Sequence, residues 1–356
     1  MTEAVRIAVA GAGLIGQRHV EAIAFARGAT LACIVDPTEA ARAYADGLGA
    51  IWYSTLTAMF EARAADGVIL ATPNQMHVEN GLECVAAGVP AIVEKPVAID
   101  VSGGEKLVAA GEAAGVPLLV GHHRRHNQLI QKAQEMIGGG ALGTIIAAHA
   151  MCWFYKPDDY FDIPWRRQAG AGPVFLNLIH DIDLLRCLCG EIETAQALES
   201  NAVRDNPVEE TAAILLRFAN GALGTVNVSD TIVAPWSWEL TARENPAYPP
   251  TGEACYLIGG RHGSLELPSL KLWRHRDRRS WWEPIDATVL PVGIEEPLIR
   301  QVRQFAAVIR GAEAPLAPAR EGLETLRVIE AVKRSARTGE IVRIGEKSII
   351  DKKSMI

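Results

Sequence analysis

The feature that most constrains this chain is a glycine-rich segment directly after an apolar run: Val5–Ala10 is followed by Gly11-Ala12-Gly13-Leu14-Ile15-Gly16. The run is continuous, as in a strand buried on both faces, and a helix is expected near 14–27. Glycines at the first, third and sixth positions permit a tight turn, a close approach of the backbone to a bound group, and close packing of helix on strand. The sequence therefore predicts an α/β fold that begins with a strand, a glycine turn and a helix.

The first 121 residues continue this alternation. Ser102 and Glu105 have the spacing of a capping box at the start of one of the helices. The alternation predicts a doubly wound parallel sheet with helices on both faces. The further strands are expected at Thr30–Val35, Val68–Ala71, Ala91–Val93 and Pro117–Val120, and the helices near 38–48, 55–64, 75–88 and 102–115.

After Gly121 the pattern changes, because strand-like stretches follow one another without helices between them. This predicts an α+β domain with a mostly antiparallel sheet over 122–345, and a frayed polar tail over 346–356. The expected strands are 144–155, 194–203, 211–219, 222–231, 254–258 and 264–273, and the expected helices are 127–137, 173–188, 296–310 and 320–337.

The composition limits the class of protein. The 35 basic and 42 acidic residues among 356 give a formal net charge of -7, which argues against a broad nucleic-acid-binding surface. No apolar run approaches the roughly 20 residues that span a bilayer. The start lacks the features of a signal peptide, and the six cysteines are scattered without a CxxC pair. We therefore expect a cytoplasmic protein without a nucleic-acid or membrane partner.

The glycine segment indicates a dinucleotide site. Free N–H groups at the start of the helix, near Gly13, Leu14 and Ile15, suit a pyrophosphate. Asp36 ends the second strand, about 20 residues after Gly16, where a carboxylate accepts hydrogen bonds from ribose hydroxyls and repels a 2′-phosphate. The predicted cofactor is therefore NAD rather than NADP, although Arg42 is placed to accommodate a phosphate.

Polar residues follow the strand Val68–Ala71. Thr72, Asn74 and His77 lie where the carboxyl ends of parallel strands meet, which is the edge at which ligands bind in such sheets. We include all three among the candidate cofactor contacts. Two simpler readings stay open, because Asn74 is equally a candidate helix N-cap and His77 a candidate surface residue.

Glu94-Lys95-Pro96 follows the strand Ala91–Val93 at the same edge. Glu94 and Lys95 are candidate cofactor contacts. A lysine here can reach a nicotinamide and a substrate hydroxyl together, polarise a carbonyl and pass a proton. The simpler reading is a surface lysine in a turn.

Together these motifs resemble the glucose–fructose oxidoreductase / inositol dehydrogenase / rhizopine-catabolism (Gfo/Idh/MocA) family. The shared motifs, in the family's order, are the glycine segment, the stretch from Thr72 to His77, Glu94-Lys95-Pro96 and a later glycine-rich segment ending at His180. The resemblance covers nearly the whole chain. It implies a Rossmann domain over 1–121 and an α+β domain with a large open sheet, through which members form homodimers or homotetramers. It also implies that Lys95 positions the substrate and assists proton transfer.

The later segment contains the family's histidine, matched here by His180, whereas the family's aspartate position holds Leu176. Asn177 and His180 share a helical face at i, i+3 spacing, so Asn177 is expected to bind the substrate without supplying an aspartate's charge. With Asp183 they form a polar stripe on an apolar helix, which is costly without a ligand. His180 is the expected general base, and Asp183 either orients it or caps a neighbour.

Basic residues mark the passage between the two domains. The family carries an arginine near the substrate here, matched by Arg124 or Arg125, and Arg124 is our candidate substrate contact. His122 and His126 have the i, i+4 spacing of helical metal ligands, but no third ligand is apparent nearby and no metal is expected. Aromatic residues that either wall a sugar pocket or belong to the core are Trp153, Trp165, Trp236, Trp238, Tyr155 and Tyr160.

We therefore expect an NAD-dependent dehydrogenase that oxidises a secondary alcohol of a sugar, an inositol-like polyol or a related cyclic hydroxy compound. Lys95 would position the hydroxyl, His180 would take its proton, and NAD would accept the hydride. Two other functions fit the same fold: an NAD-dependent glycoside hydrolase, with which NADH does not accumulate, and a catalytically silent NAD sensor, which Leu176 leaves open.

Overall fold

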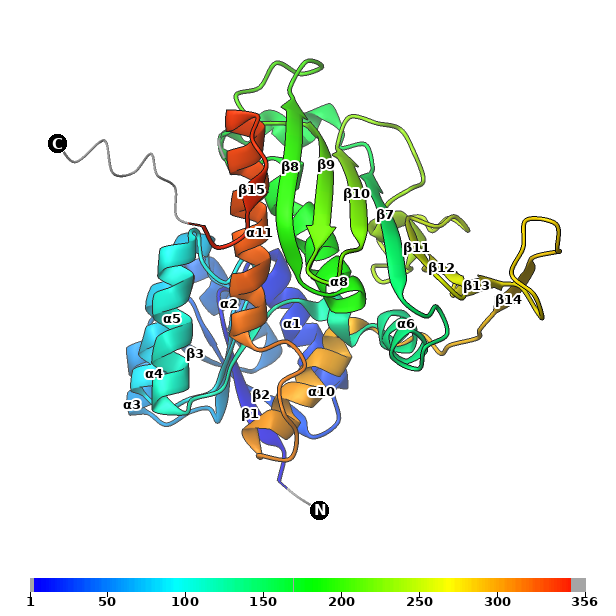
Figure 1. Cartoon of the computed structure of the whole chain (residues 1–356). Coiled ribbons are helices and arrows are strands. Elements are labelled where there is room, and N and C mark those ends of the chain that lie inside the picture. The colour runs from blue at the N-terminus through cyan, green and yellow to red at the C-terminus, as the bar shows by residue number, and fades with distance from the viewer. Residues whose placement is uncertain (1–2, 169, 347–356) are drawn as a thin grey trace. The chain divides into compact units, whose positions relative to one another are not determined.

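The computed structural model describes residues 3–168 and 170–346, which form two compact units (Figure 1). Unit 1 contains the described residues up to Gln131 together with Gly293–Leu326, and unit 2 contains Lys132–Val292 and the described residues from Arg327 onward. Residues 347–356 of the expected frayed tail lie outside the described residues. None of the described helices is long and apolar enough to cross a membrane.

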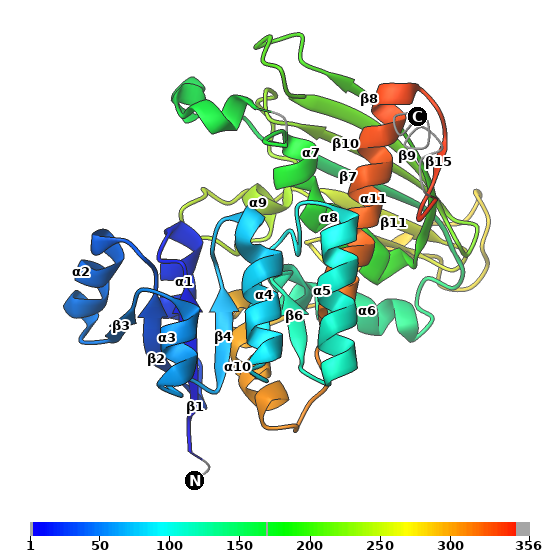
Figure 2. The same cartoon turned by 90° about the vertical axis from the view of Figure 1, so that its left-hand side faces the viewer.

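Unit 1 is built on a six-stranded parallel sheet with the order β3-β2-β1-β4-β5-β6, flanked by helices (Figure 2). The sequence order reverses between β1 and β4, and such a reversal marks the ligand crevice of a doubly wound sheet. The strands are β1 Val5–Ala10, β2 Ala29–Val35, β3 Ile51–Tyr53, β4 Gly67–Leu70, β5 Ala91–Val93 and β6 Leu118–Val120. The helices are α1 Leu14–Phe25, α2 Glu39–Leu48, α3 Leu56–Glu61, η1 Asn74–Met76, α4 His77–Ala86, α5 Val101–Ala114 and η2 His123–His126.

The parallel sheet is confirmed, with two local differences from the sequence prediction. The three-residue strand β3 was not predicted, because it is short and only partly buried. The expected capping box at Ser102 is wrong. Helix α5 begins one residue earlier, and the Asp100 carboxylate accepts a hydrogen bond from Gly103 N at 2.7 Å. Asp100 has the extended backbone of an N-cap, and its carboxylate satisfies a first-turn amide that Ser102, already inside the helix, cannot reach.

A later segment completes the core of unit 1. Helix α10, Pro297–Ile309, buries Val302, Phe305 and Ala306 in the same apolar cluster as Ile7 and Val9 of β1. The two compact units therefore differ from the contiguous segments 1–121 and 122–345. The chain returns to the first sheet at this point because the apolar face of α10 is buried there.

Unit 2 is built on a nine-stranded sheet with the order β14-β13-β12-β11-β7-β10-β9-β8-β15. Among the described strand pairs of this sheet, only β7–β10 is parallel, so the mostly antiparallel prediction is confirmed. The strands are β7 Ile145–Trp153, β8 Ile192–Ser200, β9 Thr211–Phe218, β10 Leu223–Ser229, β11 Tyr256–Gly260, β12 Ser264–Leu267, β13 Lys271–Arg274, β14 Asp286–Val289 and β15 Val342–Arg343. The remaining helices are α6 Gln128–Gly138, η3 Asp158–Asp162, η4 Pro164–Arg167, α7 Pro173–Leu176, α8 Leu178–Cys189, α9 Trp238–Thr241 and α11 Ala319–Thr338.

Two expected elements of unit 2 are divided in the structure. The strand predicted over 264–273 becomes β12 and β13, because Leu270 adopts a positive φ of 51° in the turn between them. The helix predicted over 173–188 breaks at Asn177 into α7 and α8. The short strands β14 and β15 were not predicted.

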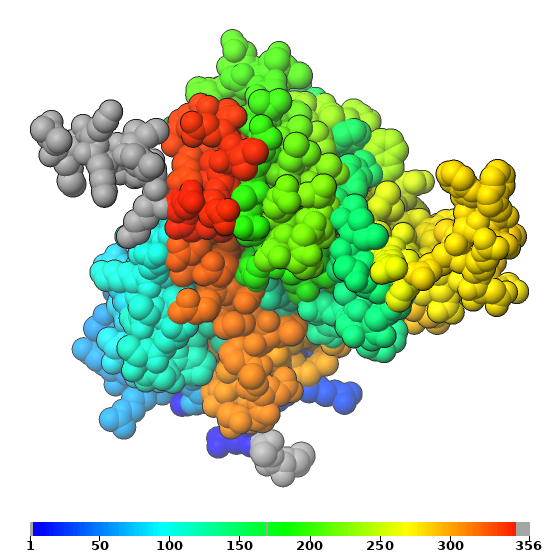
Figure 3. Space-filling model, viewed as in Figure 1, coloured from blue at the N-terminus to red at the C-terminus, as the bar shows by residue number. Residues whose placement is uncertain are grey.

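One face of the large sheet packs on α8 and the other is open. Along β9 buried and exposed residues alternate, so that Ile214 is buried whereas Leu215 is 55% exposed. Leu198, Leu223 and Leu257 are likewise exposed on neighbouring strands. In Figure 3 the green surface of β8, β9 and β10 faces the viewer without a helix over it.

Candidate functional site

The glycine turn between β1 and α1 has the geometry that its sequence predicts. Gly11 has φ +92°, and a Cβ there would overlap the Ala71 carbonyl oxygen. A Cβ on Gly16 would overlap the carbonyl oxygen of Gly11. At Gly13, in contrast, a Cβ would meet no protein atom within 4 Å. Gly11 and Gly16 are therefore required by the packing of the turn, whereas Gly13 leaves open space in front of the helix.

The start of α1 offers backbone donors to that space. Gly13 is the N-cap and provides no side-chain acceptor for the first-turn amides. Such amides, here including those of Leu14 and Ile15, have no acceptor within the helix. The Leu14 side chain is 85% exposed and Ile15 is partly buried. This cradle fits a pyrophosphate through backbone N–H groups and the positive end of the helix dipole.

Asp36 is held in a fixed orientation at the end of β2. Its Oδ2 accepts a hydrogen bond from Ala12 N at 3.0 Å, and its Oδ1 accepts from Thr38 N at 2.9 Å and Thr38 Oγ1 at 2.6 Å. Burial raises the pKa of Asp36, but the hydrogen bonds from Thr38 and Ala12 outweigh it and hold the pKa below its ordinary value. Asp36 is therefore an oriented carboxylate at neutral pH. Arg42 lies 5.4 Å from the centre of the Trp52 ring.

His77 is a structural link between two loops. It is fully buried, with Nδ1 2.7 Å from the Pro96 carbonyl oxygen and Nε2 2.9 Å from the Thr72 carbonyl oxygen. Both ring nitrogens are thus engaged by backbone, so the structure does not support His77 as a surface residue or as a direct cofactor contact. His77 instead fixes the loops that carry Thr72 and Lys95.

Asn74 and Thr72 lie in the loop after β4. The alternative reading of Asn74 as an N-cap is wrong, because η1 intervenes and α4 begins after Met76 without a side-chain cap. The Thr72 hydroxyl donates to Asn80 Oδ1 at 3.0 Å. Asn74 remains partly exposed at this edge of the sheet.

Glu94 is a buried carboxylate between helix α1 and Lys95. Its Oε1 lies 2.7 Å from Nε2 of His19 on α1, and its Oε2 accepts the Lys95 N–H at 3.1 Å. Burial raises the pKa of Glu94, but His19 above all, then the charges of His123 and Lys95, lowers it to about 2. Because Glu94 is 5% exposed, it orients the lysine backbone rather than reaching outward.

His19 was missed by sequence reasoning. It stands on the inner face of α1 with Gly16, Val20 and Ile23, where the helical period predicts an apolar residue. A histidine at such a position signals a buried partner. Its partner, Glu94, directly follows strand β5, 75 residues away, so the pair could not be read from local spacing.

Lys95 is half-buried immediately after β5, and the peptide bond to Pro96 is cis. His123 of η2 belongs to the same charged environment. Burial above all, together with the charges of Arg124 and Lys95, lowers the pKa of His123 to about 3, against the opposing charge of Glu94. The His123 imidazole is therefore neutral at pH 7 and lies near Lys95. The sequence did not identify His123 as a candidate residue.

The basic segment is buried. Arg124 and Arg125 are 5% and 6% exposed, and Arg125 forms an ion pair of 2.9 Å with Glu321 of α11. Arg125 is therefore structural within unit 1. The segment forms the 3₁₀ turn η2, so His122 and His126 do not have helical i, i+4 geometry. Among the described residues no group of three potential metal ligands was found.

In unit 2 the glycine-rich segment precedes α7. A Cβ on Gly172 would overlap the Glu209 carboxylate, which accepts a hydrogen bond from Val174 N at 3.2 Å. Lys333 lies 2.6 Å from Glu209 and 2.8 Å from Glu199. Gly172 is thus required so that Glu209 can cap α7, and that cap positions the residues that follow.

Asn177 and His180 lie at the junction of α7 and α8. His180 N donates to the Asn177 carbonyl at 3.1 Å, and the His180 side chain is 7% exposed. The Asn177 Oδ1 is buried without a hydrogen-bond partner among the described residues. Asp183 is buried one turn further along α8. His180 and Asp183 therefore lie within α8, whereas Asn177 lies at the break before it.

Asp181 differs from Asp183. The Tyr256 hydroxyl of β11 donates to Asp181 Oδ1, and the Tyr256 ring stacks on Trp238 with centroids 5.4 Å apart. Asp181 therefore anchors α8 to the sheet, and Trp238 belongs to the core. Tyr256 was not predicted, because its partner lies on a distant segment.

The other aromatic residues are divided between packing and exposure. Trp153 contacts Trp236 edge to face at 5.8 Å and donates to Asn227 Oδ1. Tyr160 lies under the Arg166 guanidinium at 4.0 Å. Trp165 and Tyr155 are exposed.

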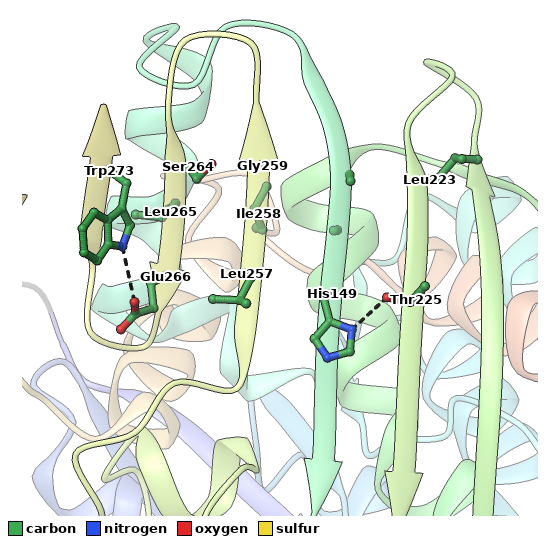
Figure 4. Close-up of a pocket in the computed structure, with 12 residues that line it drawn as sticks. His149, Leu223, Thr225, Leu257, Ile258, Gly259, Ser264, Leu265, Glu266 and Trp273 are labelled. Carbon is green, nitrogen blue, oxygen red and sulfur yellow. Dashed lines mark hydrogen bonds between the residues drawn. The ribbon is translucent and has the colours of Figure 1, made fainter. Parts of the chain in front are cut away.

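A shallow hollow of about 430 Å³ lies on the large sheet (Figure 4). His149 Nδ1 is 2.8 Å from Thr225 Oγ1 on the next strand, and Trp273 Nε1 donates to Glu266 Oε2 at 3.4 Å. The residues that line it come from β7, β10, β11, β12 and β13, and its surface is mostly apolar. The loop and helix residues predicted for substrate binding are not among them.

Family models match both parts of the chain. An oxidoreductase family with an NAD-binding Rossmann fold matches residues 5–122, and the GFO/IDH/MocA C-terminal domain matches residues 130–266. Rhizopine catabolism protein MocA of Rhizobium meliloti is 26% identical over 92% of this chain and 93% of its own length. Inositol 2-dehydrogenase 2 of Saccharopolyspora erythraea is 30% identical over 62% of this chain and 66% of its own length.

Solved structures share the fold. The WlbA dehydrogenase from Bordetella pertussis, crystallised with NADH and UDP-GlcNAcA, is 27% identical, with a TM-score of 0.77 over 97% of this chain and 100% of that chain. An oxidoreductase from Agrobacterium radiobacter, crystallised with NAD+, L-tartaric acid and magnesium, is 23% identical. Its TM-score is 0.81, over 96% of this chain and 98% of that chain. Unit 1 thus carries an NAD-binding Rossmann domain, and the chain belongs to the GFO/IDH/MocA oxidoreductase family.

Proposed function

We propose that the chain is an NAD(H)-dependent dehydrogenase for a secondary alcohol of a sugar, an inositol-like polyol or a related cyclic hydroxy compound. The observation that carries this proposal is the buried Glu94, which accepts the Lys95 N–H and lies 2.7 Å from His19 on the cofactor helix. It ties the backbone of the candidate catalytic lysine to the element that receives the dinucleotide. Named relatives support the substrate class, including MocA and inositol 2-dehydrogenase 2.

The proposed cofactor is NAD rather than NADP. The cradle at Gly13 accommodates the pyrophosphate, and the oriented Asp36 carboxylate is placed to accept hydrogen bonds from ribose hydroxyls. The same negative charge disfavours a 2′-phosphate. Thr72, Asn74 and Glu94 are proposed to shape the nicotinamide end from the loops after β4 and β5.

In the proposed reaction the C–H and O–H bonds of the alcohol are broken and a ketone forms. NAD, when bound, accepts the hydride from the carbon. The Lys95 ammonium holds the hydroxyl and later the carbonyl oxygen by hydrogen bonding, and His180 accepts the hydroxyl proton. The Asn177 amide binds a neighbouring hydroxyl, Asp183 orients His180, and Arg124 is a further proposed substrate contact.

The open sheet face is proposed to form a homodimer or homotetramer. Leu198, Leu215, Leu223 and Leu257 are exposed on the uncovered side of β8, β9, β10 and β11. Several exposed large apolar side chains on one sheet face are typical of an interface. A second copy of the same face is self-complementary by two-fold symmetry.

The test is absorbance at the NADH band, with NAD and a panel of sugars and cyclitols added to the purified protein. Lys95→Ala is expected to abolish the rise given by the correct substrate, and Lys106→Ala, an exposed lysine of α5, is the matched control. Glycoside cleavage without accumulation of NADH would replace the dehydrogenase proposal with the hydrolase. NAD binding without either activity would support the catalytically silent NAD sensor instead.

A further inference from the structure

A separate cavity of unit 1 runs along helix α10. Its volume is about 290 Å³, and it extends to Arg27, which follows the C-terminal end of α1, opposite to the glycine turn. Arg300 and Arg303 of α10 and Arg310, its C-cap, line it at intervals of three and seven residues, so the helical period places them on one face. The proposed oxidation does not use any of these residues.

The cavity has an excess of positive charge. Four guanidinium groups line it, against the single carboxylate of Glu313. Arg300 and Arg303 share one further carboxylate, Glu295, at 3.3 Å. Arg310 donates to the carbonyl oxygens of Glu3 and Gly28 at 2.9 and 2.8 Å, which leaves its charge uncompensated by these contacts. Arg27 has no ion pair among the described residues.

A buried imidazole also lines the cavity. His126 is 2% exposed, and its Nε2 has no hydrogen-bond partner among the described residues. The carbonyl of the same residue accepts a hydrogen bond from Arg300 Nε at 2.8 Å, so His126 and the arginine row are held together. A buried ring nitrogen without a protein partner is costly unless a ligand or solvent engages it.

We propose that this cavity binds a small multivalent oxyanion, carrying phosphate or carboxylate groups, between the α10 arginines, Arg27 and His126. The planar guanidinium group donates two parallel hydrogen bonds to such groups, and several guanidinium groups around one small cavity favour more than one negative charge. A cavity of this size holds a small organic anion or pyrophosphate. The site is distinct from the dinucleotide cradle, and the inference does not depend on the substrate of the oxidation.

The experiment is titration calorimetry of the full chain in phosphate-free buffer, with NAD at saturation so that the glycine turn is occupied. Pyrophosphate and citrate are titrated separately, which distinguishes phosphate from carboxylate recognition. Arg27→Gln/Arg303→Gln is the test variant. Arg274→Gln/Arg278→Gln, which removes the same charge from exposed positions of unit 2, is the matched control.

We expect one probe to bind with a stoichiometry of one per chain, at least tenfold more weakly in the test variant and within twofold of the wild type in the control. NAD affinity in both variants reports whether the fold is intact. No binding of either probe to the wild type would overturn the proposal. Equal weakening by both variants would also overturn it, because it would show attraction by overall charge rather than a site.

Discussion

Nε2 of His19 lies 2.7 Å from Oε1 of Glu94, although 75 residues separate them in the sequence. The pair joins the inner face of the cofactor helix to the residue before Lys95. Both side chains are buried. The backbone position of the candidate lysine therefore depends on a contact that neither local segment specifies.

Removing the imidazole is expected to destabilise the protein strongly. His19→Leu leaves a buried carboxylate without its main partner, and such a loss typically costs about 3–5 kcal/mol. Urea unfolding at pH 7 measures the change. The double variant His19→Leu/Glu94→Leu completes a thermodynamic cycle, and additive effects of the two changes would contradict the coupling.

The same pair gives a pH dependence. The pKa of Glu94 is held at about 2, below its ordinary 4.5, so the folded state keeps the carboxylate charged where the unfolded state takes up a proton. This contribution to the free energy of unfolding is complete above about pH 4.5 and is lost as the pH falls toward 2. Glu94→Gln is expected to flatten the loss of stability in that window. A curve parallel to that of the wild type would refute the assignment.

Substitutions in the glycine turn are expected to affect stability and NAD binding separately. Gly16→Ala places a methyl group against the Gly11 carbonyl oxygen and is expected to destabilise unit 1 by about 1–3 kcal/mol or more. The methyl group of Gly13→Ala meets only open space, so this variant is expected to change stability little. It is expected to lower the affinity for NAD at least tenfold. Thermal unfolding and NAD titration test the two readouts. Equal NAD affinity in Gly13→Ala and wild type would show that the cradle is not the pyrophosphate site.

Asp36 is expected to determine the choice of dinucleotide. Asp36→Ser removes the carboxylate that would repel a 2′-phosphate, so the ratio of NAD to NADP affinity should fall at least tenfold. Glu39→Ser removes an exposed carboxylate from the next helix and is the matched control. An unchanged ratio in Asp36→Ser would contradict the role of this side chain.

Association of the chain is expected to depend on the open sheet face. Leu215→Glu and Leu198→Glu each place a charge on that face, and light scattering should report monomers at micromolar concentration. Leu48→Glu, at an exposed position of unit 1, is the control and should leave the mass unchanged. An unaltered oligomer in both sheet variants would place the interface elsewhere.

The parallel sheet could be predicted because its strands are continuous apolar runs, and because Gly11 and Gly16 are dictated by local backbone geometry. Helical spacing placed His180 and Asp183 on one helix, whereas the break at Asn177 was not predicted. His19 and Tyr256 could not be found in this way. Each is defined by a carboxylate on another element, Glu94 and Asp181 respectively, and pairing between distant segments leaves no periodic signal.

The same reasoning explains two errors at the level of single residues. Asn74 and Ser102 both have side chains suited to helix caps, but the backbone a few residues away decides which residue occupies the cap position. Asp100 precedes α5 in the extended conformation, and η1 separates Asn74 from α4. Local propensity names the kind of residue, whereas the surrounding chain selects the position.

Helix α10 bears on how the polypeptide matures during synthesis. The dinucleotide-binding half is translated first, yet Val302, Phe305 and Ala306 of its core are made only after the strands of the large sheet from β7 to β14. During synthesis the apolar face of its sheet therefore stays uncovered until the strands β7 to β14 have been translated. A nascent chain stalled before Pro297 is expected to be the form of this protein that most needs a chaperone.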